Sequence, residues 1–396
     1  MELKVGYKQT EAGIIPEEWE VKRLGEIGKV VRGGSPRPAG DPKFFDGDFI
    51  PWLTVAALTN IPDHQLQVRH TESGLTEEGS KRSRTLQPET VIIANSGATL
   101  GIAKVSAIKC CANDGVAAII DQHNGNKAFI CHCINAQTQR LREVVATGNG
   151  QPNLNTGLIK EIGIPWPPQA EQAAIAECFS DLDKLLQSLE DAVAKKHGLK
   201  QAAMQELLTG KRRLPGFEGE WEATKLGDVA NIKTGSRNNE DKNEDGEYPF
   251  FVRSDNVERI NSYSYDCEAI LVPGEGRIGE IFHYVNGRFD VHQRVYAITQ
   301  FKAGLSGKFV HSYMAMNFGA WAMQNTVKAT VDSLRLPTFK TFEMLVPPSE
   351  DEQDAIAAVL SEMDAELEAY EARLKKARDL KQGMMQELLS GRIRLR

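Results

Sequence analysis

The sequence predicts an α+β protein in which two mixed α/β domains alternate with two long helices. Three observations support this prediction: a long stretch that occurs twice, similar entry segments ahead of both copies, and short apolar runs bounded by Gly and Pro in the intervening parts. The internal duplication decides the domain organisation.

The repeated stretch covers residues 172–214 and 353–395, which stay in register at an offset of 181. The five residues Met204–Leu208 are identical to Met385–Leu389. An ungapped match of this length indicates that one half of the chain is a duplicate of the other.

Each copy is predicted to be one helix. Prolines precede both copies, where a helix can start but cannot continue backwards. Gly210 and Gly391 stand where a helix stop is expected, and Ser349 with Glu352 fits a capping box. Roughly 39 residues lie between these limits, which is about 58 Å of helix.

The apolar residues of both helices alternate in steps of four and three, which is typical of a coiled-coil seam of about five heptads. Because the two halves follow each other in cyclic order, we expect a pseudo-twofold relation and an antiparallel helix pair. The alternative is that each helix packs only on its own domain. The seam residues are Ile175, Phe179, Leu182, Leu186, Leu189, Val193, Ala203 and Leu207, and Ile356, Leu360, Met363, Leu367, Tyr370, Leu374, Met384 and Leu388.

A lysine interrupts each seam at a matched position, Lys200 and Lys381. In an antiparallel pair these two lysines do not face each other. We expect each of them to lie near acidic residues such as Glu171 or Glu352, where the partner helix begins.

The composition is that of a soluble chain of 396 residues, long enough for two or three domains. No stretch approaches eighteen apolar residues, so no membrane span is predicted, and the N-terminus lacks a signal-peptide core. We therefore expect a cytoplasmic protein. The six cysteines lack standard zinc-site spacing, and reduced thiols are expected.

The net charge of −7 is unevenly distributed. Residues 169–209 and 347–396 each carry −3, whereas residues 1–168 carry 0 and residues 210–346 carry −1. The globular parts can therefore present basic faces, and tight DNA binding is expected to need a partner's help.

The duplication extends into the globular parts, with about twenty extra residues in the first copy within Val55–Glu89. The matched segments are Trp19 with Trp221 at an offset of 202, Arg32–Ser35 with Lys233–Ser236 at 201, and Ser96–Gly101 with Gly274–Gly279 at 178. Strands are predicted at Thr90–Ala94, Val116–Ile120, Ala269–Val272 and Val295–Thr299, and helices at 126–146 and 304–325.

The segment Gly274–Gly279 has the form G-x-G-x-x-G, but strand-like residues follow it where a dinucleotide site requires a helix. A tight turn is therefore the favoured interpretation. The sequence contains no phosphate-binding loop, amino-methyltransferase motif, zinc-protease motif or serine-hydrolase motif. We expect a chain that is not an enzyme and holds no metal or cofactor of its own.

The proline-rich helix entry, the exit Gln-Glu-Leu-Leu-x-Gly-Lys/Arg and the Trp…Leu-Gly start of each half resemble the specificity subunit of type I restriction–modification enzymes. The residues that carry this resemblance are Pro167-Pro168, Glu171-Gln172 and Gln205–Lys211, then Pro347-Pro348, Glu352-Gln353 and Gln386–Arg392.

The resemblance implies two target-recognition domains that each read one half of a split sequence in double-stranded DNA. The two helices would form the spacer and dock two methyltransferase subunits, which use S-adenosylmethionine to methylate adenine. Motor–nuclease subunits would join for restriction, and ATP would also be bound by partners. The predicted limits are 1–168 and 211–349 for the recognition domains, and 169–210 and 350–396 for the spacer helices.

Candidate DNA contacts follow from the chemistry of the loops, since Arg, Asn and Gln read base edges and other polar groups contact the backbone. Arg277 is ranked ahead of Thr99, its counterpart in the matched turn. The candidates in the first half are Ser35, Arg37, Arg69, Lys81, Arg82, Arg84, Thr99, Gln151 and Asn153, and in the second half Ser236, Arg237, Arg253, Asn256, Arg277, His292, Gln293, Arg294, Lys328 and Arg335.

Two other functions remain open at this point. A coiled-coil scaffold that binds proteins but not DNA would account for the acidic helices. A stand-alone enzyme with fused activities would need methyltransferase and nuclease motifs, which the sequence lacks.

Overall fold

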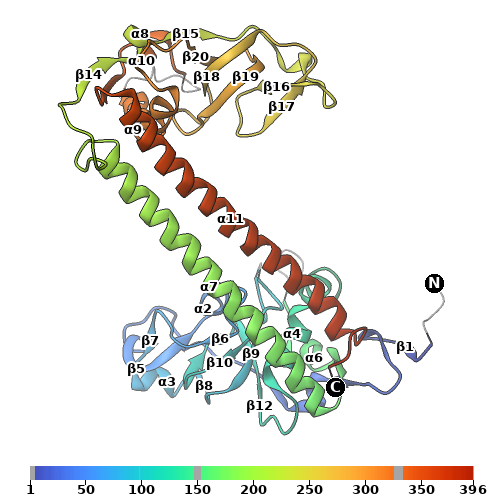
Figure 1. The fold of residues 1–396 in the computed structure, drawn as a ribbon. Helices are drawn as coiled ribbons and strands as arrows, with labels where there is room; N and C mark the ends of the chain where they lie inside the picture. Colours follow the sequence, from blue (N-terminus) through green and yellow to red (C-terminus); the bar gives the residue numbers. More distant parts are fainter. Residues whose placement is uncertain (1–4, 98, 147–152, 325–332, 396) are drawn as a thin grey trace. The chain divides into compact units, whose positions relative to one another are not determined.

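The computed structural model describes residues 5–97, 99–146, 153–324 and 333–395. The chain forms two compact units, unit 1 (Met1–Asp191 with Ala372–Arg396) and unit 2 (Ala192–Glu371). The long helices α7 (Gln169–Leu207) and α11 (Glu350–Leu389) each contribute one end to each unit (Figure 1). None of the helices within the described residues is long and apolar enough to cross a membrane.

Unit 1 mixes short helices with curved sheets. Its strands are β1 (Tyr7–Thr10), β2 (Gly13–Pro16), β3 (Glu20–Arg23), β4 (Lys29–Arg32), β5 (Phe45–Leu53), β6 (Gln67–Val68), β7 (Gly74–Leu75), β8 (Arg84–Leu86), β9 (Thr90–Ala94), β10 (Ala103–Ser106), β11 (Cys110–Ala112), β12 (Val116–Ile120) and β13 (Gly163–Trp166). Its shorter helices are α1 (Leu24–Ile27), α2 (Val55–Thr59), α3 (Glu77–Ser80), α4 (Lys127–Asn135), α5 (Thr138–Arg140), a π-helical turn (Leu141–Val145) and α6 (Thr156–Lys160).

The main sheet of unit 1 has the order β4-β12-β9-β10-β6, and a second sheet has the order β7-β5-β11-β8. Strand β9 lies in the middle of the main sheet and all five of its residues are buried, which explains its continuous apolar run. Helix α4 packs on this sheet and buries Phe129 and Ile130. The same core takes in Phe179 from α7 and Leu388 from α11.

Unit 2 repeats this plan with fewer elements. Its strands are β14 (Glu222–Lys225), β15 (Asn231–Thr234), β16 (Tyr248–Phe251), β17 (Val257–Ile260), β18 (Tyr265–Pro273), β19 (His283–Val291), β20 (Val295–Thr299) and β21 (Glu343–Val346). Its shorter helices are α8 (Leu226–Val229), a 3₁₀ turn (Asn239–Asp241), α9 (Gly307–Gln324) and α10 (Leu336–Lys340).

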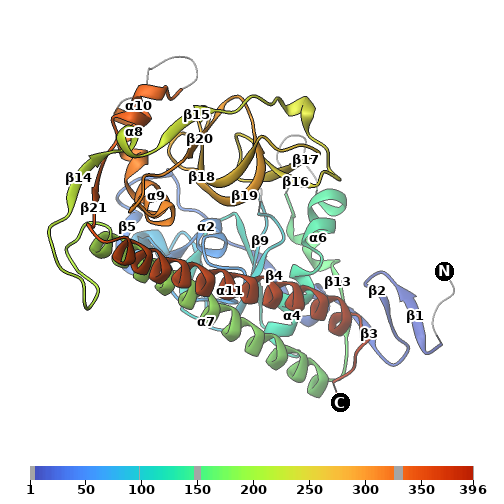
Figure 2. The ribbon, with the colours of Figure 1, turned by 45° about the horizontal axis from the view of Figure 1, so that its top comes forward.

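The six strands of the unit 2 sheet follow the order β15-β20-β18-β19-β16-β17. Figure 2 shows α9 beside this sheet, where Phe309 and Phe318 are fully buried. The core also includes Leu207 of α7 and Ile356 of α11. The predicted strands at Thr90–Ala94, Val116–Ile120 and Val295–Thr299 are confirmed residue for residue, and Ala269–Val272 lies within β18.

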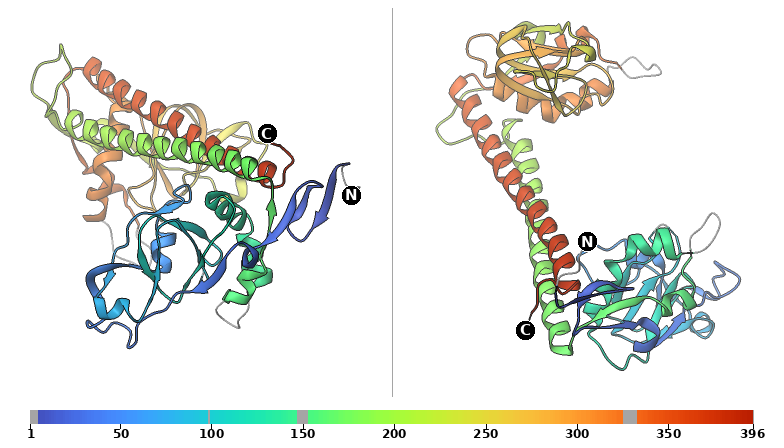
Figure 3. Two further views of the ribbon diagram at one scale, coloured as in Figure 1. Left: turned by 90° about the horizontal axis from the view of Figure 1, so that it is seen from below. Right: turned by 90° about the vertical axis from the view of Figure 1, so that its right-hand side faces the viewer.

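The two long helices run antiparallel within each unit (Figure 3). In unit 1, Lys381 Nζ lies 2.6 Å from Asp183 Oδ1 and Arg378 Nη2 lies 2.8 Å from Glu190 Oε1. In unit 2, Lys196 Nζ lies 2.5 Å from Glu366 Oε2, and Lys200 pairs with Asp364. The predicted antiparallel pair is therefore confirmed, and the helix ends also pack into the core of their own unit.

The structure corrects the prediction for the two interrupting lysines. Lys381 and Lys200 pair with Asp183 and Asp364, twelve residues beyond the glutamates that were expected to attract them. Those glutamates are bound by arginines from the helix exits. Glu171 accepts from Arg394 Nε and Nη2, both at 2.7 Å, because a guanidinium matches a carboxylate with two parallel hydrogen bonds.

The same arrangement recurs in unit 2, where Arg213 donates from Nε and Nη2 to Glu352 at 2.5 and 2.6 Å. Both carboxylate oxygens of Glu352 are thus engaged by an arginine, in place of the capping box expected with Ser349. Trp19 lies under Arg394 and Trp221 under Arg213, at 5.2 and 5.9 Å from the ring centroids. The two ion pairs correspond through the repeat, because Glu171 and Glu352 are matched at the offset of 181 and so are Arg213 and Arg394.

Candidate nucleic-acid interface

Four loops at the strand ends gather on one surface in each unit, which we call the strand-end surface. In unit 1, backbone bonds join Gly33 N to Val116 O, Gly34 N to Ala112 O, Asn113 N to Leu53 O and Asn95 N to Gly115 O, at 2.8 to 3.0 Å. In unit 2, the corresponding bonds join Gly235 N to Val295 O, Ser236 N to Val291 O, His292 N to Phe251 O and Gly274 N to Arg294 O, at 2.8 to 3.2 Å.

These matched bonds refine the alignment of the two halves. Gly33 corresponds to Gly235, so the offset of 202 continues through β4 and β15 and the predicted offset of 201 is wrong by one residue. Asn95 corresponds to Gly274 at an offset of 179 residues. Leu53 and Phe251 still differ by 198, so the extra residues of unit 1 lie between β5 and β9, as predicted.

A glycine is required where β4 and β15 end. A Cβ atom on Gly33 would lie 2.0 Å from the carbonyl oxygen of Asn113, and one on Gly235 would lie 2.0 Å from that of Val291. No side chain fits at that distance, so the neighbouring loops approach the backbone directly.

Arginines surround a single carboxylate on the strand-end surface of unit 1. Arg37 Nη2 lies 3.7 Å from Asp114 Oδ2, and Ser35 Oγ donates to Asp114 Oδ1 at 2.7 Å. Arg32 donates to the Asp114 carbonyl at 2.6 Å, and Arg84 donates to the Arg32 carbonyl at 2.7 Å. The cluster therefore holds more positive than negative charge.

Arg32, Arg84 and the neighbouring Arg82 form no salt bridge with a carboxylate among the residues that the structure describes. The guanidinium of Arg82 lies over the ring of Phe44 at 4.5 Å. Guanidinium groups that are held in place without a carboxylate are suited to bind phosphate oxygens or guanine edges.

Carboxylates balance the arginines on the strand-end surface of unit 2. Glu275 accepts a hydrogen bond from Arg253 Nη1 at 3.3 Å and forms an ion pair with Arg294 Nη1 at 3.1 Å. Arg277, the preferred candidate, pairs with Asp255 and lies 2.8 Å from Glu280. The two surfaces thus share a backbone frame but differ in charge.

Two other candidates in unit 2 have structural partners. Arg237 Nε donates at 2.9 Å to Asp290, a fully buried carboxylate, and therefore stabilises the fold of the loop. His292 is buried, and its Nδ1 accepts from the Arg294 backbone N–H at 3.0 Å. Burial lowers the pKa of His292, and the nearby Arg253 and Arg294 add to this shift.

The remaining candidates divide by position. Four lie on or beside the strand-end surface: Ser236, Gln293, Asn153 and Arg335. Asn153 forms a β-bridge with Ser96, and Arg335 follows Leu334, whose backbone N–H donates to the Gly274 carbonyl. Four are less directly involved: Thr99 and Asn256 lie in adjoining turns, Lys81 is paired with Glu77 and Glu78, and Arg69 lies apart at the end of β6. Gln151 and Lys328 lie outside the described residues.

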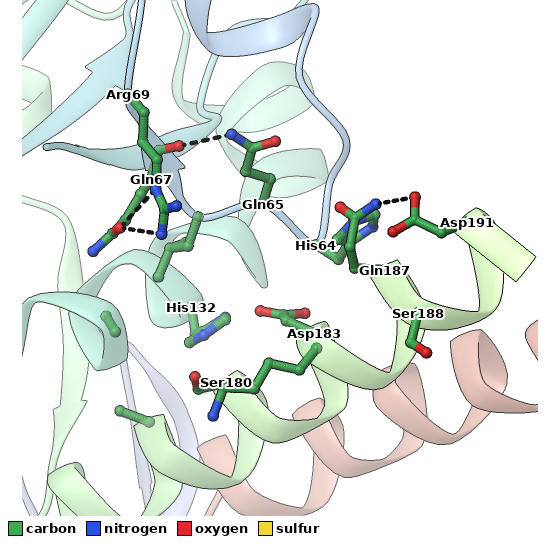
Figure 4. A pocket seen from close by; sticks show the side chains of 14 residues that line it. His64, Gln65, Gln67, Arg69, His132, Ser180, Asp183, Gln187, Ser188 and Asp191 are labelled. Atoms are coloured by element: carbon green, nitrogen blue, oxygen red, sulfur yellow. Dashed lines mark hydrogen bonds between the residues drawn. The ribbon is translucent and has the colours of Figure 1, made fainter.

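A hollow of about 760 Å³ separates Arg69 from helix α7 in unit 1 (Figure 4). His64 closes one side, with Nε2 2.9 Å from Gln187 Oε1, and His132 and Asp183 line the floor. Burial lowers the pKa of His132 to about 3, with help from the positive charges of Lys381 and Lys104. The ring of His132 packs on Phe179 at 4.6 Å, which fits a neutral imidazole.

The structure brings into the site residues that are not among the sequence-based candidates. Arg32 and Asp114 organise the cluster in unit 1, and Glu275 and Asp255 hold the arginines of unit 2. Their signal in the sequence is the presence of acidic and basic residues in the same loops, whereas the candidates were donors to DNA alone.

The chain consists of two similar α/β units, and each unit has a strand-end surface and contains one end of each long helix. This arrangement defines a duplicated recognition protein. The family model of the type I restriction modification DNA specificity domain matches residues 16–196 and again residues 218–377. Because these two matches cover most of the chain, the chain belongs to this family.

Relatives in this family are named specificity subunits. The chain is 26% identical over 248 residues to the type I restriction enzyme MjaIX specificity subunit of Methanocaldococcus jannaschii, a match that covers 58% of this chain and 56% of that protein. It is 23% identical over 443 residues to the putative MjaX specificity subunit of the same organism, which covers 98% of this chain and 97% of that one. The chain thus spans about half the length of MjaIX and nearly all of MjaX.

Solved structures show the same fold. The crystal structure of a type I restriction-modification system S subunit from M. genitalium matches with a TM-score of 0.66 at 14% identity, and 98% of each chain is covered. A chain from a structural study of complex assembly and conformational transition of the type I R-M system matches with a TM-score of 0.58 at 16% identity.

Proposed function

We propose that this chain is the DNA-binding specificity subunit of a type I restriction–modification system. Each unit reads one half of a bipartite target in double-stranded DNA. The carrying observation is that both units build the strand-end surface with the same four backbone hydrogen bonds but present different side chains on it. Such surfaces suit two different half-sites, because base contacts specify sequence while shared frames set orientation.

The helix pair is the proposed spacer and docking site for two methyltransferase subunits, and motor–nuclease subunits complete the assembly in the cytoplasm. Its charge favours this role. The segments 169–209 and 347–396 each carry a net charge of −3, which disfavours contact with phosphates and leaves the helices for protein partners.

Catalysis is assigned to the partners in this proposal. The methyltransferase subunits bind S-adenosylmethionine and methylate adenine, and the motor–nuclease subunits bind ATP. This chain then contributes sequence recognition, and it needs no cofactor of its own.

The test is to express the chain with its methyltransferase and to sequence the methylated bases in the host DNA. We expect methylated adenines within a bipartite motif that has a fixed gap. A chain that is well folded and binds the methyltransferase, yet directs no methylation and binds no DNA, would instead be the coiled-coil scaffold that the acidic helices also suit.

A further inference from the structure

Glu275 occupies a distinctive place on the strand-end surface of unit 2. It follows Gly274, whose N–H donates to the Arg294 carbonyl at 2.8 Å, in the turn between β18 and β19. Its side chain is 24% exposed and lines a hollow of about 490 Å³ together with Arg253 and Ser254. A carboxylate therefore faces an open space on a surface that we propose meets DNA.

Two arginines from different loops fix the orientation of this carboxylate. Oε2 accepts a hydrogen bond from Arg253 Nη1 at 3.3 Å, and Oε1 forms an ion pair with Arg294 Nη1 at 3.1 Å. An ionised carboxylate offers about four acceptor sites, so each oxygen keeps capacity for a further donor. The flanking guanidinium groups also offset the repulsion between Glu275 and nearby phosphates.

The chemistry of DNA leaves few partners for such a group. Phosphates repel a carboxylate, and the favourable donors in the major groove are the exocyclic amino groups, of which cytosine N4 is the usual partner of Glu and Asp. We infer that Glu275 is a specificity-determining residue that accepts a hydrogen bond from a cytosine amino group in the half-site of unit 2. This inference rests on the proposed function.

The matched position in unit 1 supports a role in recognition rather than in folding. Ser96 bridges to Asn153 as Glu275 bridges to Ser333, so the backbone at this position is the same in both units. Unit 1 forms this backbone without a carboxylate, and the frame therefore does not require one. A serine hydroxyl both donates and accepts, so it gives no comparable preference for cytosine.

The nearby carboxylates of Asp255 and Glu280 differ from Glu275 in exposure. They are 61% and 59% exposed and both pair with one arginine, Arg277. Exposed ion pairs of this kind contribute little to stability. Glu280 is therefore the matched control, an acidic residue of the same turn without the double clamp.

The experiment uses the complex of the full chain with its methyltransferase and measures binding to duplexes that carry the methylated motif. One cytosine of the unit 2 half-site at a time is replaced by 2-pyrimidinone, which lacks the 4-amino group. With the unaltered chain, we expect one replacement to weaken binding about tenfold to a hundredfold. With Glu275→Ala, the same replacement should change binding less than threefold, whereas Glu280→Gln should behave like the unaltered chain.

Replacement of the opposing guanine by 7-deazaguanine separates this contact from an arginine contact to the same base pair. The inference is overturned if every 2-pyrimidinone replacement weakens DNA binding equally in the unaltered chain and in Glu275→Ala. It is also overturned if Glu275→Ala changes the response of binding only to 7-deazaguanine replacements. If the unaltered complex shows no sequence preference in either half, the proposed function itself has failed, which is a different result.

Discussion

Lys381 on α11 donates to Asp183 on α7 at 2.6 Å, and both side chains are only 14% exposed. The matched pair in unit 2, Lys200 with Asp364, has side-chain exposures of 25% and 47%. One sequence repeat has therefore placed the same ion pair in two environments, one nearly buried and one half open to water.

Removal of the lysine should have unequal effects in the two units. Lys381→Ala leaves Asp183 desolvated and unpaired, which should lower the free energy of unfolding of unit 1 by about 3 kcal/mol. Lys200→Ala should cost about 1 kcal/mol or less, because water screens the exposed pair. Urea unfolding of both variants checks this, and equal losses would contradict the difference in burial. Changing both Lys381 and Asp183 to Leu should recover most of the stability.

The buried His132 should make unit 1 sensitive to acid. Its pKa is about 3 in the folded state, mainly because of burial, against an ordinary value of 6.5. Between these values the unfolded chain binds a proton that the folded chain does not, so stability falls as the pH drops below 6.5. The slope is up to about 1.4 kcal/mol per pH unit.

The histidine contribution is isolated by comparison with a variant. His132→Leu should flatten the dependence of stability on pH between pH 6.5 and pH 4, as followed by urea unfolding at several pH values. His197→Gln is the control, since its side chain is 57% exposed. Similar slopes for the unaltered chain and His132→Leu would show that other groups dominate acid unfolding.

The arginines at the helix exits should each hold a buried glutamate in place. Among the described residues, Arg394→Ala leaves Glu171 with only the Trp19 indole N–H, at 3.2 Å, and Arg213→Ala leaves Glu352 fully buried without its partner. Each substitution should lower the free energy of unfolding of its own unit by about 3–5 kcal/mol. Fluorescence during unfolding reports the affected unit in chains that keep Trp19 or Trp221 as the single tryptophan of the five. Arg→Lys should restore only part of the loss, because an ammonium lacks the two-point geometry.

The strand-end surfaces should differ in their response to salt. Arg32→Ala and Arg84→Ala should each reduce the slope of log K against log salt for DNA binding by about 0.9, one phosphate contact each. Arg277→Ala should change this slope less, because the charge of Arg277 is already balanced by Asp255 and Glu280. It should instead weaken the free energy of binding to one half-site by about 1–3 kcal/mol. Titrations at several salt concentrations and the methylated motif measure both effects. An unchanged motif in Arg277→Ala would remove Arg277 from the list of base-reading residues.

Periodicity and duplication were enough to predict the helix pair, because the burial of Phe179, Leu186 and Leu367 follows from local spacing alone. Strands β9, β12 and β20 could be predicted equally well from the sequence, since each is a short apolar run with clear limits. These features depend on residues close together in the sequence.

The partners of individual charges could not be derived in this way. Arg277 finds Asp255 across 22 residues, and Arg394 finds Glu171 across 223 residues. Such contacts depend on how loops converge in three dimensions. The repeat does indicate the partners of the two lysines, because Asp183 and Asp364 are matched at the same offset as Lys200 and Lys381.

The backbone bonds that join the strand ends have an evolutionary consequence. A main-chain N–H or C=O is the same whichever side chain it carries, so most positions in these loops can drift without loss of the frame. Gly33 and Gly235 are clear exceptions, since even a methyl group would collide with a carbonyl oxygen 2.0 Å away. Under the proposed function, single substitutions at other positions of these loops can therefore change the target preference, while the two glycines keep the backbone frame.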